Sequence, residues 1–267
     1  MPASTNAKWN AADYAANSVV QQTWARELIA KLNLRGDEHI LDIGCGDGKV
    51  TAEIARAVPR GSVTGVDASA EMIGFASKTF PSGRFPNLKF QIADARKICF
   101  EKKFTVLFSN AALHWVDDHE EFLRGAASAL KPGGRLVVSC GGKGNAQDVF
   151  VALRPEMRLK RWSKFFRRMP KPYFFYAPGD YEKWLPKFGF QPLHVKLAPK
   201  DATYEGHAGF ATWLRTTWIP YVQRVPENLR EEFIAAIAAR YLSKHPPDKS
   251  GCVHVRMVRL EIDAVKI

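Results

Sequence analysis

The chain of 267 residues is 46% hydrophobic and 25% charged, a balance that excludes disorder over most of its length. Its net charge of +12 leaves anionic substrates, nucleic acids and anionic membranes open as partners. No apolar run reaches the roughly 18 residues that span a bilayer, and residues 1–10 have no apolar core of the signal-peptide kind. The four cysteines are too far apart for a zinc site or a disulfide framework to be expected. We therefore expect a cytoplasmic protein without a metal site.

Apolar periodicity predicts alternating helices and strands along the first half of the chain. The expected helices cover residues 18–33, 47–58, 69–79 and 120–130, and the expected strands cover 38–44, 63–67, 88–92, 104–109 and 135–140, the last after a turn at 132–134. Further on, a helix is expected at 181–187, strands at 190–197 and 253–265, and aromatic-rich helices within 206–243. This alternation indicates an α/β fold with a parallel sheet covered by helices on both faces.

The expected organisation is one domain with helical additions. Residues 1–142 form the α/β core with an N-terminal capping helix, 143–176 form a basic helical insertion, and 177–267 supply the remaining strands and helices that cap the substrate. No polar linker separates a second independent domain.

Most of the net positive charge falls in residues 143–200, which hold 13 Lys and Arg against 4 Asp and Glu. Within this region, residues 154–169 predict one amphipathic helix. Its basic face holds Arg154, Arg158, Arg161, Lys164 and Arg168, and its apolar face holds Leu159, Trp162, Phe166 and Met169. Three interpretations stay open: a solvated face over a packed stripe, a lid that attracts an acidic substrate, or a surface for RNA or an anionic membrane.

A glycine-rich turn follows the first expected strand, in the run Asp42-Ile-Gly44-Cys-Gly46-Asp47-Gly. Glycines at such a turn let a ligand approach the backbone at a helix N-terminus. The spacing differs from the dinucleotide pattern G-x-G-x-x-G, and the two aspartates would repel a pyrophosphate. A nucleoside that carries sulfonium and ammonium groups fits the turn better.

Two more acids end the next two expected strands. Asp67 lies where an acid accepts hydrogen bonds from ribose hydroxyls in doubly wound folds, and Asp94 is placed to accept from an adenine amine. Three such motifs at the ends of three successive strands are strong support for a nucleoside site.

From about Tyr14 to Cys140 the chain resembles the class I S-adenosylmethionine-dependent methyltransferases. This resemblance implies a Rossmann-like sheet of seven mostly parallel strands, the last antiparallel, and S-adenosylmethionine as the cofactor. The positions that the resemblance assigns to the cofactor are Tyr14, Asp42, Gly44, Cys45, Gly46, Asp67, Ala68, Met72, Asp94, Ala95 and Asn110.

A narrower resemblance lies in the runs Tyr14-x-x-Asn-Ser-x-x-Gln21 and Leu113-His114-Trp115-Val116, which are similar to the trans-aconitate and juvenile-hormone-acid methyltransferase group. It implies that Gln21 and Trp115 hold the carboxyl group of the acceptor. His114 is a candidate base for a hydroxyl or amine acceptor, or a structural histidine. A carboxylate acceptor is already ionised and needs no base.

The predicted function is transfer of a methyl group from S-adenosylmethionine to a small anionic acceptor, by O-methylation of a carboxylate. Nucleic acid is a disfavoured partner, because Asn110 is followed by alanines where enzymes that methylate base amines have a Pro-Pro pair. Two alternatives stay open: an RNA methyltransferase recruited by the basic insertion, and an S-adenosylmethionine-binding module without catalysis.

Overall fold

The computed structural model describes residues 19–267, with side chains from Gln22 onward, and this part of the chain forms two compact units. The sheet unit contains residues 19–143, 173–198 and 259–267, and the helical unit contains residues 144–172 and 199–258. In the described part of the chain, no helix combines the length and the apolar character that crossing a bilayer requires.

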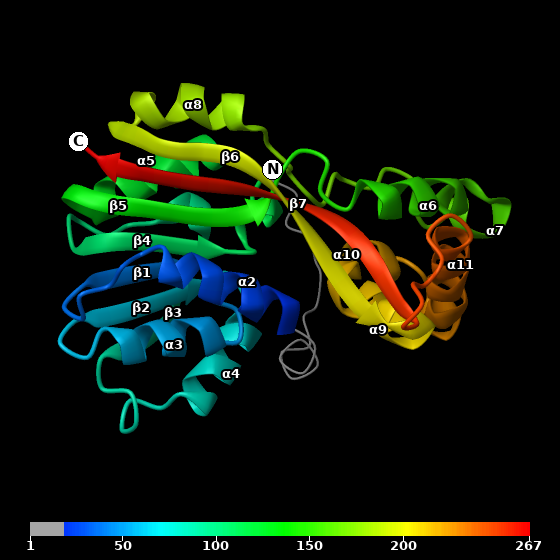
Figure 1. Cartoon of the computed structure of the whole chain (residues 1–267), viewed down its shortest axis with the longest axis horizontal. Helices are drawn as coiled ribbons and strands as arrows, with labels where there is room; N and C mark the ends of the chain where they lie inside the picture. Colours follow the sequence, from blue (N-terminus) through cyan, green and yellow to red (C-terminus); the bar gives the residue numbers. More distant parts are fainter. Residues whose placement is uncertain (1–18) are drawn as a thin grey trace. The chain divides into compact units, whose positions relative to one another are not determined.

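The sheet has seven strands in the order β3-β2-β1-β4-β5-β7-β6 (Figure 1). Neighbouring strands from β3 to β5 pair in parallel, and β7 runs antiparallel to β5. The strands are β1 (His39–Ile43), β2 (Ser62–Asp67), β3 (Leu88–Ile92), β4 (Phe104–Asn110), β5 (Leu130–Gly141), β6 (Phe190–Glu205) and β7 (Cys252–Lys266). The expected Rossmann-like, mostly parallel seven-stranded sheet is confirmed.

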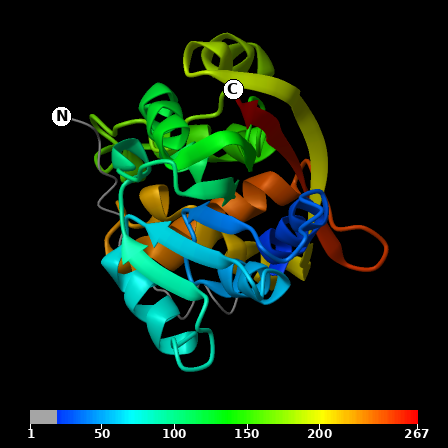
Figure 2. The same ribbon diagram turned by 90° about the vertical axis from the view of Figure 1, so that its left-hand side faces the viewer.

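Helices cover both faces of this sheet, as Figures 1 and 2 show. One face, with Ile40 and Val63, packs against α2 and α3, and the other, with Leu41 and Val66, packs against α5 and α8. Successive residues of a strand point to opposite faces, so the nearly continuous apolar runs of these strands fill both cores. The helices of this unit are α2 (Val19–Ala30), α3 (Lys49–Ala57), α4 (Ala70–Thr79), α5 (His119–Ala129) and α8 (Pro178–Lys187), with short 3-10 turns η1 (Ala95–Lys97) and η2 (Leu113–Trp115).

Two strands are longer than the sequence predicts. β5 begins at Leu130 and includes the Pro-Gly-Gly run that was expected to be a turn. Phe104 pairs with Leu130 and Val106 with Arg135, so the additional residues form an irregularity in the ladder and do not end the strand. β6 continues from Phe190 to Glu205, past the expected end at residue 197.

The helical unit consists of α6 (Gln147–Arg158), α7 (Lys160–Ser163), α9 (Gly206–Thr217), α10 (Ile219–Val222), η3 (Glu227–Leu229) and α11 (Arg230–Leu242). The prediction of a single helix over 154–169 is wrong, because the chain leaves helical geometry at Leu159. Glu156 and Trp162 are both buried, with Trp162 against Phe233 of α11. An unbroken helix would turn these two side chains to different sides, since six residues correspond to about 600° of rotation.

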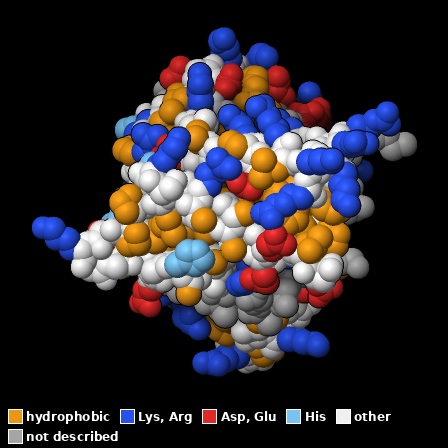
Figure 3. Space-filling view, turned by 90° about the vertical axis from the view of Figure 1, so that its right-hand side faces the viewer, with side chains coloured by type: hydrophobic (Ala, Val, Ile, Leu, Met, Phe, Trp, Pro, Cys, Tyr) orange, Lys and Arg blue, Asp and Glu red, His pale blue; other side chains and the backbone are white. Residues whose placement is uncertain are grey.

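The basic side chains of residues 147–171 lie on the surface of the helical unit. All of the Lys and Arg residues in this segment are exposed, namely Arg154, Arg158, Lys160, Arg161, Lys164, Arg167, Arg168 and Lys171, which we call the basic segment. Its two acids, Asp148 and Glu156, form ion pairs with Arg256 and Arg240. Lys and Arg stand out with hydrophobic groups between them on the face of the molecule drawn in Figure 3.

Candidate functional site

The glycine turn after β1 is fixed by its backbone conformation and by backbone hydrogen bonds to β2. Gly44, Gly46 and Gly48 have φ values of 74°, 53° and 79°, which glycine adopts without a steric penalty. The N–H groups of Gly44 and Cys45 both donate to the carbonyl of Val66 in β2, at 2.7 and 3.0 Å. A Cβ on Gly44 would lie 2.1 Å from the Cβ of Ala112, so only glycine fits there.

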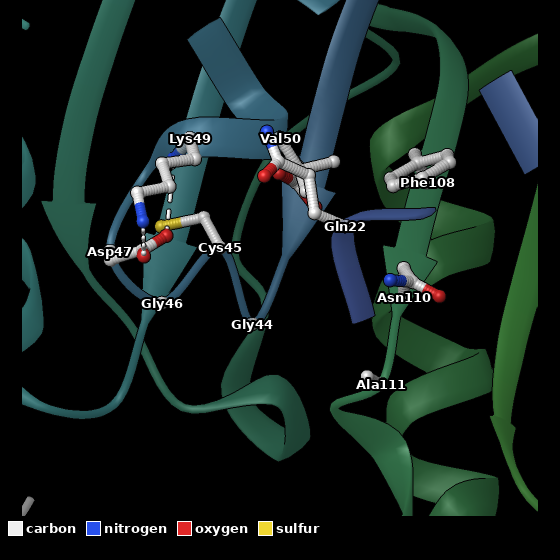
Figure 4. Close-up of a pocket in the computed structure, with 11 residues that line it drawn as sticks. Gln22, Gly44, Cys45, Gly46, Asp47, Lys49, Val50, Phe108, Asn110 and Ala111 are labelled. Carbon is white, nitrogen blue, oxygen red and sulfur yellow. Dashed lines mark hydrogen bonds and ion pairs between the residues drawn. The ribbon is translucent and has the colours of Figure 1, made fainter. Parts of the chain in front are cut away.

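This turn forms one wall of a pocket that is partly open to solvent (Figure 4). Its empty space, open solvent included, is about 500 Å³. The pocket is formed by residues of α2, β1, the glycine turn, the start of α3 and the end of β4. The lining residues are Gln22, Asp42, Gly44, Cys45, Gly46, Asp47, Lys49, Val50, Phe108, Asn110 and Ala111. Five of the predicted cofactor residues therefore meet in one pocket: Asp42, Gly44, Cys45, Gly46 and Asn110.

Two buried carboxyl groups belong to this lining. Asp42 is 2% exposed and accepts a hydrogen bond of 2.7 Å from the Thr51 hydroxyl. Burial raises the pKa of Asp42 to about 7, the Thr51 hydrogen bond opposes the rise, and the charge of Asp67 adds to it. The Oδ2 of Asp47 is buried without a hydrogen bond from the described residues, and the Lys49 ammonium lies 3.6 Å away. A cationic ligand group would satisfy both carboxylates.

The predicted ribose acid, Asp67, lies at the end of β2 and joins the glycine turn to the start of α4. Its Oδ2 accepts from the Gly46 N–H at 3.0 Å and its Oδ1 from the Ser69 N–H at 2.9 Å. Burial raises the pKa of Asp67. Ala68 is exposed beside it and Met72 is buried in α4. These residues adjoin the turn without lining the pocket.

Asp94 has a partner that sequence reasoning missed. The Arg96 guanidinium forms a bidentate ion pair with Asp94, with the shortest contact at 2.6 Å, and also binds Asp117 at 2.9 Å. The hydrogen bonds from Arg96 lower the pKa of Asp94, so this carboxylate stays ionised. Its oxygens can still accept a hydrogen bond from another donor. Ala95 begins η1 directly after it.

His114 and Trp115 lie in η2, after β4, among aromatic rings. The Trp115 ring packs edge-on against Tyr173 with a centroid distance of 4.8 Å. The backbone N–H of Gly141 donates to Nδ1 of His114 at 3.3 Å, which places the imidazole proton on Nε2. Burial, together with the charges of Arg259 and His119, lowers the pKa of His114 to about 3. The ring is therefore neutral and a weak base.

Two predicted residues cannot be placed: Tyr14 lies outside the described residues, and the Gln21 side chain lies outside the described side chains. Cys45 is 7% exposed, and burial with the charges of Asp42 and Asp67 raises the pKa of its thiol well above the usual value. This thiol is therefore no nucleophile at neutral pH. The described residues contain no group of three His, Cys, Asp or Glu side chains that could hold a metal ion.

The structure adds a buried cation, Arg259 of β7, to the surroundings of this site. Its guanidinium donates to the side-chain oxygen of Asn110 at 3.1 Å. The sequence contains one signal of this residue: the apolar alternation of Val253, Val255 and Met257 changes phase before Leu260, and Arg259 lies at the change. Arg215 of the helical unit is paired with a carboxylate: it forms a bidentate ion pair with Glu231, with contacts of 2.6 and 2.8 Å.

The buried Oδ2 of Asp47, which has no hydrogen bond from the described residues, and the raised pKa of the buried Asp42 match a ligand with positively charged groups. The open backbone at the glycines matches a ligand that lies close to the turn. The pocket is therefore suited to a cationic nucleoside of the kind that the sequence predicts.

Comparisons with known proteins agree with this description. Residues 40–134 match the model of a methyltransferase domain family. A trans-aconitate 2-methyltransferase of Deinococcus radiodurans is 35% identical over 90% of this chain and 93% of its own length. Another, from Rhodopseudomonas palustris, is 28% identical over 97% of this chain and its full length. A solved structure of a putative methyltransferase from Bacillus halodurans covers 91% of this chain and 99% of its own, with a TM-score of 0.64 and 18% identity.

Proposed function

Because the chain belongs to the class I S-adenosylmethionine-dependent methyltransferases, we propose that it methylates a carboxylate oxygen of a small anionic molecule. The chain is an S-adenosylmethionine-dependent enzyme. The acceptor class and the residues that act on it are the proposal. The relatives named as trans-aconitate methyltransferases, which match nearly the whole chain, support an acidic acceptor.

The state of His114 is the observation that carries the choice of a carboxylate. A hydroxyl or amine acceptor gains from a base that removes its proton. His114 is poorly suited to this task, since Gly141 uses its Nδ1 lone pair and its pKa is lowered to about 3. A carboxylate is ionised at neutral pH and attacks without such a base.

The residues of the pocket fit the cofactor by charge. Asp42 and Asp47 would hold the ammonium and face the sulfonium side, and the glycine turn would lie along the amino acid part. Asp67 would accept from the ribose hydroxyls through oxygens that still have free lone pairs, and Asp94 from the adenine amine. Bound S-adenosylmethionine supplies an electrophilic methyl group, which the acceptor oxygen takes as the sulfonium C–S bond breaks.

The other residues orient the acceptor and exclude water. Trp115, packed against Tyr173, offers a rigid indole with one N–H donor. His114 presents its Nε2–H as a second neutral donor. We also assign an acceptor contact to Gln21. Neutral donors hold a carboxylate without neutralising the charge that makes it nucleophilic, and alignment of this kind can supply about 7–11 kcal/mol.

The proposal is tested by incubating the protein with S-adenosylmethionine labelled in the methyl group and a panel of acceptors. The panel pairs small di- and tricarboxylic acids, trans-aconitate included, with their neutral amides and with alcohols and amines of similar size. Label that enters only the acids and is released by base shows a methyl ester. Transfer to alcohols or amines and not to acids would overturn the proposal. Tight donor binding without any transfer would favour a module that has lost catalysis.

The basic segment gives one reason to keep RNA as a second acceptor, because its eight exposed cations suit a polyanion. Its aromatic residues weaken this alternative. Trp162 is buried against Phe233, and Phe166 also packs on that ring at 5.3 Å, so neither offers an open face for a base.

A further inference from the structure

Arg259 is a cation buried within the sheet unit. It lies on β7 opposite Gly141 of β5 and is 4% exposed. Its Nε donates to the Ser139 hydroxyl at 3.1 Å, and its Nη2 donates to the Ser139 carbonyl and, at 3.1 Å, to Oδ1 of Asn110. The guanidinium also lies over the Trp24 ring, 5.4 Å from its centroid. Burying an arginine is costly, so such a set of contacts fixes its position.

This arrangement determines which way the Asn110 amide faces. A guanidinium has only donors, so the group that meets it must be the amide oxygen. The amide nitrogen is then turned the other way. Figure 4 shows this nitrogen on the side of Gly44 and the oxygen on the opposite side. Because Asn110 lines the pocket, its N–H₂ group is presented there as a donor.

The pocket consequently has two ends of opposite character. Asp42 and Asp47 offer buried carboxylates at the glycine turn. The Asn110 donors, with the Arg259 charge behind them, form the other end. A negatively charged oxygen would be stabilised at that end by hydrogen bonds and by the potential of the arginine, whereas an ammonium group would be repelled.

We propose that Arg259 is a positioning residue that holds the Asn110 amide as a hydrogen-bond donor to a carboxylate in this pocket. The inference rests on the proposed function, in which two carboxylates are present: that of the amino acid part of S-adenosylmethionine and that of the acceptor. Both offer the same chemistry to Asn110.

Substitution of Asn110 by Asp tests the direction of the amide. The two side chains have the same shape, and an aspartate would still accept from Arg259. It would present an oxygen to the pocket in place of the N–H₂ group, so binding of the carboxylate should weaken by about tenfold or more. Arg259→Met should weaken it in the same direction, and Arg259→Lys should restore part of the loss by keeping the charge. Arg256→Met, on the same strand but 65% exposed at its side chain, is the matched control.

Two ligands distinguish the donor carboxylate from that of the acceptor. S-adenosylhomocysteine has the amino acid part, and 5′-methylthioadenosine lacks it. If Asn110 binds the donor carboxylate, calorimetry should show weaker S-adenosylhomocysteine binding with 5′-methylthioadenosine binding unchanged. If it binds the acceptor, both affinities should stay constant while the KM of the acid rises by about tenfold and kcat changes less.

The inference is overturned if Asn110→Asp leaves both the affinity for S-adenosylhomocysteine and the KM of the acid within about twofold of the parent. It is also overturned if the two nucleosides lose affinity equally in a variant that melts at the parent temperature. If no acid is methylated, the proposed function fails by itself. The inference is then decided by the two nucleosides alone. It is contradicted if Asn110→Asp leaves the ratio of the affinities for S-adenosylhomocysteine and 5′-methylthioadenosine as it is in the parent.

Discussion

The two units of this protein place their charged groups in different ways. In the sheet unit, Asp42 and Arg259 are almost fully buried and held by hydrogen bonds. In the helical unit the core is aromatic, with the ring of Phe210 tilted against that of Tyr241 at a centroid distance of 4.7 Å, and the charges of the basic segment face solvent. Buried and fixed charges can select a ligand by its own charges, whereas solvated charges contribute mainly to attraction at a distance. The contrast predicts that substitutions at the candidate site of the sheet unit change binding and chemistry, and that those in the basic segment do not.

The largest effect is expected from Gly44→Ala. The added Cβ would lie 2.1 Å from that of Ala112, at a residue whose φ is positive, so the turn must move. We expect binding of S-adenosylhomocysteine to weaken by about 100-fold, measured by calorimetry. Gly74→Ala in α4 is the control, because no atom beyond its chain neighbours and the backbone of its own helix lies within 4 Å of its added Cβ. It should stabilise the fold by about 1 kcal/mol and leave binding unchanged. If the Gly44 variant binds S-adenosylhomocysteine as tightly as the parent, the predicted difference between the candidate site and the basic segment is wrong.

Trp115→Ala separates binding from chemistry within the sheet unit. Loss of the indole removes a donor and the ring packed on Tyr173, so turnover of an acidic acceptor should fall by about 30-fold. Affinity for S-adenosylhomocysteine should change by less than about twofold. Trp115→Phe keeps the ring and should recover part of the turnover. Unchanged kcat/KM in the alanine variant would remove Trp115 from the acceptor site.

Asp67→Ala removes the acceptor that binds both the glycine turn and the start of α4. Two backbone donors, from Gly46 and Ser69, lose their partner, as would a ribose hydroxyl. The affinity for S-adenosylmethionine should fall by about tenfold or more. Asp37→Ala, at an exposed carboxylate, is the control. If the Asp67 variant binds as tightly as the parent, the ribose assignment is wrong.

The pH dependence of the pocket follows from Asp42. Its pKa of about 7 in the folded protein exceeds the usual value, so the folded state retains a proton that the unfolded chain loses. Stability without ligand should therefore fall as pH rises towards 7. Affinity for the cationic donor should rise several-fold as pH increases through 7, because the ionised form binds the cation. Thermal unfolding between about pH 4 and 8 measures the first trend, and calorimetry between about pH 6 and 8 measures the second. In Asp42→Asn, stability and affinity should both lose this dependence on pH. If the parent protein shows no such dependence, Asp42 is not the group that binds the cation.

The smallest effect is expected in the basic segment. Combined substitution of Arg154, Arg158, Lys160 and Lys164 by Gln removes four exposed charges. Affinity for S-adenosylhomocysteine and turnover of a small acid should both stay within about twofold of the parent. Binding to bulk tRNA over a range of salt concentrations is the sharper comparison. A steep salt dependence that the substitutions abolish, together with methylation of the tRNA, would establish the RNA alternative.

The parts of the site that the sequence predicted are those in which local geometry dictates residue type. Gly44 and Gly46 adopt positive φ, and Asp67 follows a strand directly, so neighbouring residues suffice to recognise them. The strands of the sheet were predicted for the same reason, because each is a short apolar run bounded by turn residues.

Features that depend on distant residues could not be predicted in this way. Arg259 meets Asn110 across 149 positions of the chain, and the break at Leu159 depends on how Trp162 packs against α11. The ion pair of Arg96 with Asp94 is local, yet an arginine near a strand end is common enough to carry no signal by itself. The charges and the apolar periodicity of the sequence do not show which of these tertiary contacts form.

The surroundings of Cys45 have a further consequence for an enzyme of this family. Sulfur in its thiolate form attacks methyl groups readily, and this cysteine belongs to the turn that we propose to lie along the methyl donor. Burial and the nearby aspartates keep the sulfur protonated. On the proposed cofactor site, the same carboxylates that would attract the cationic donor would also protect the protein from alkylating itself.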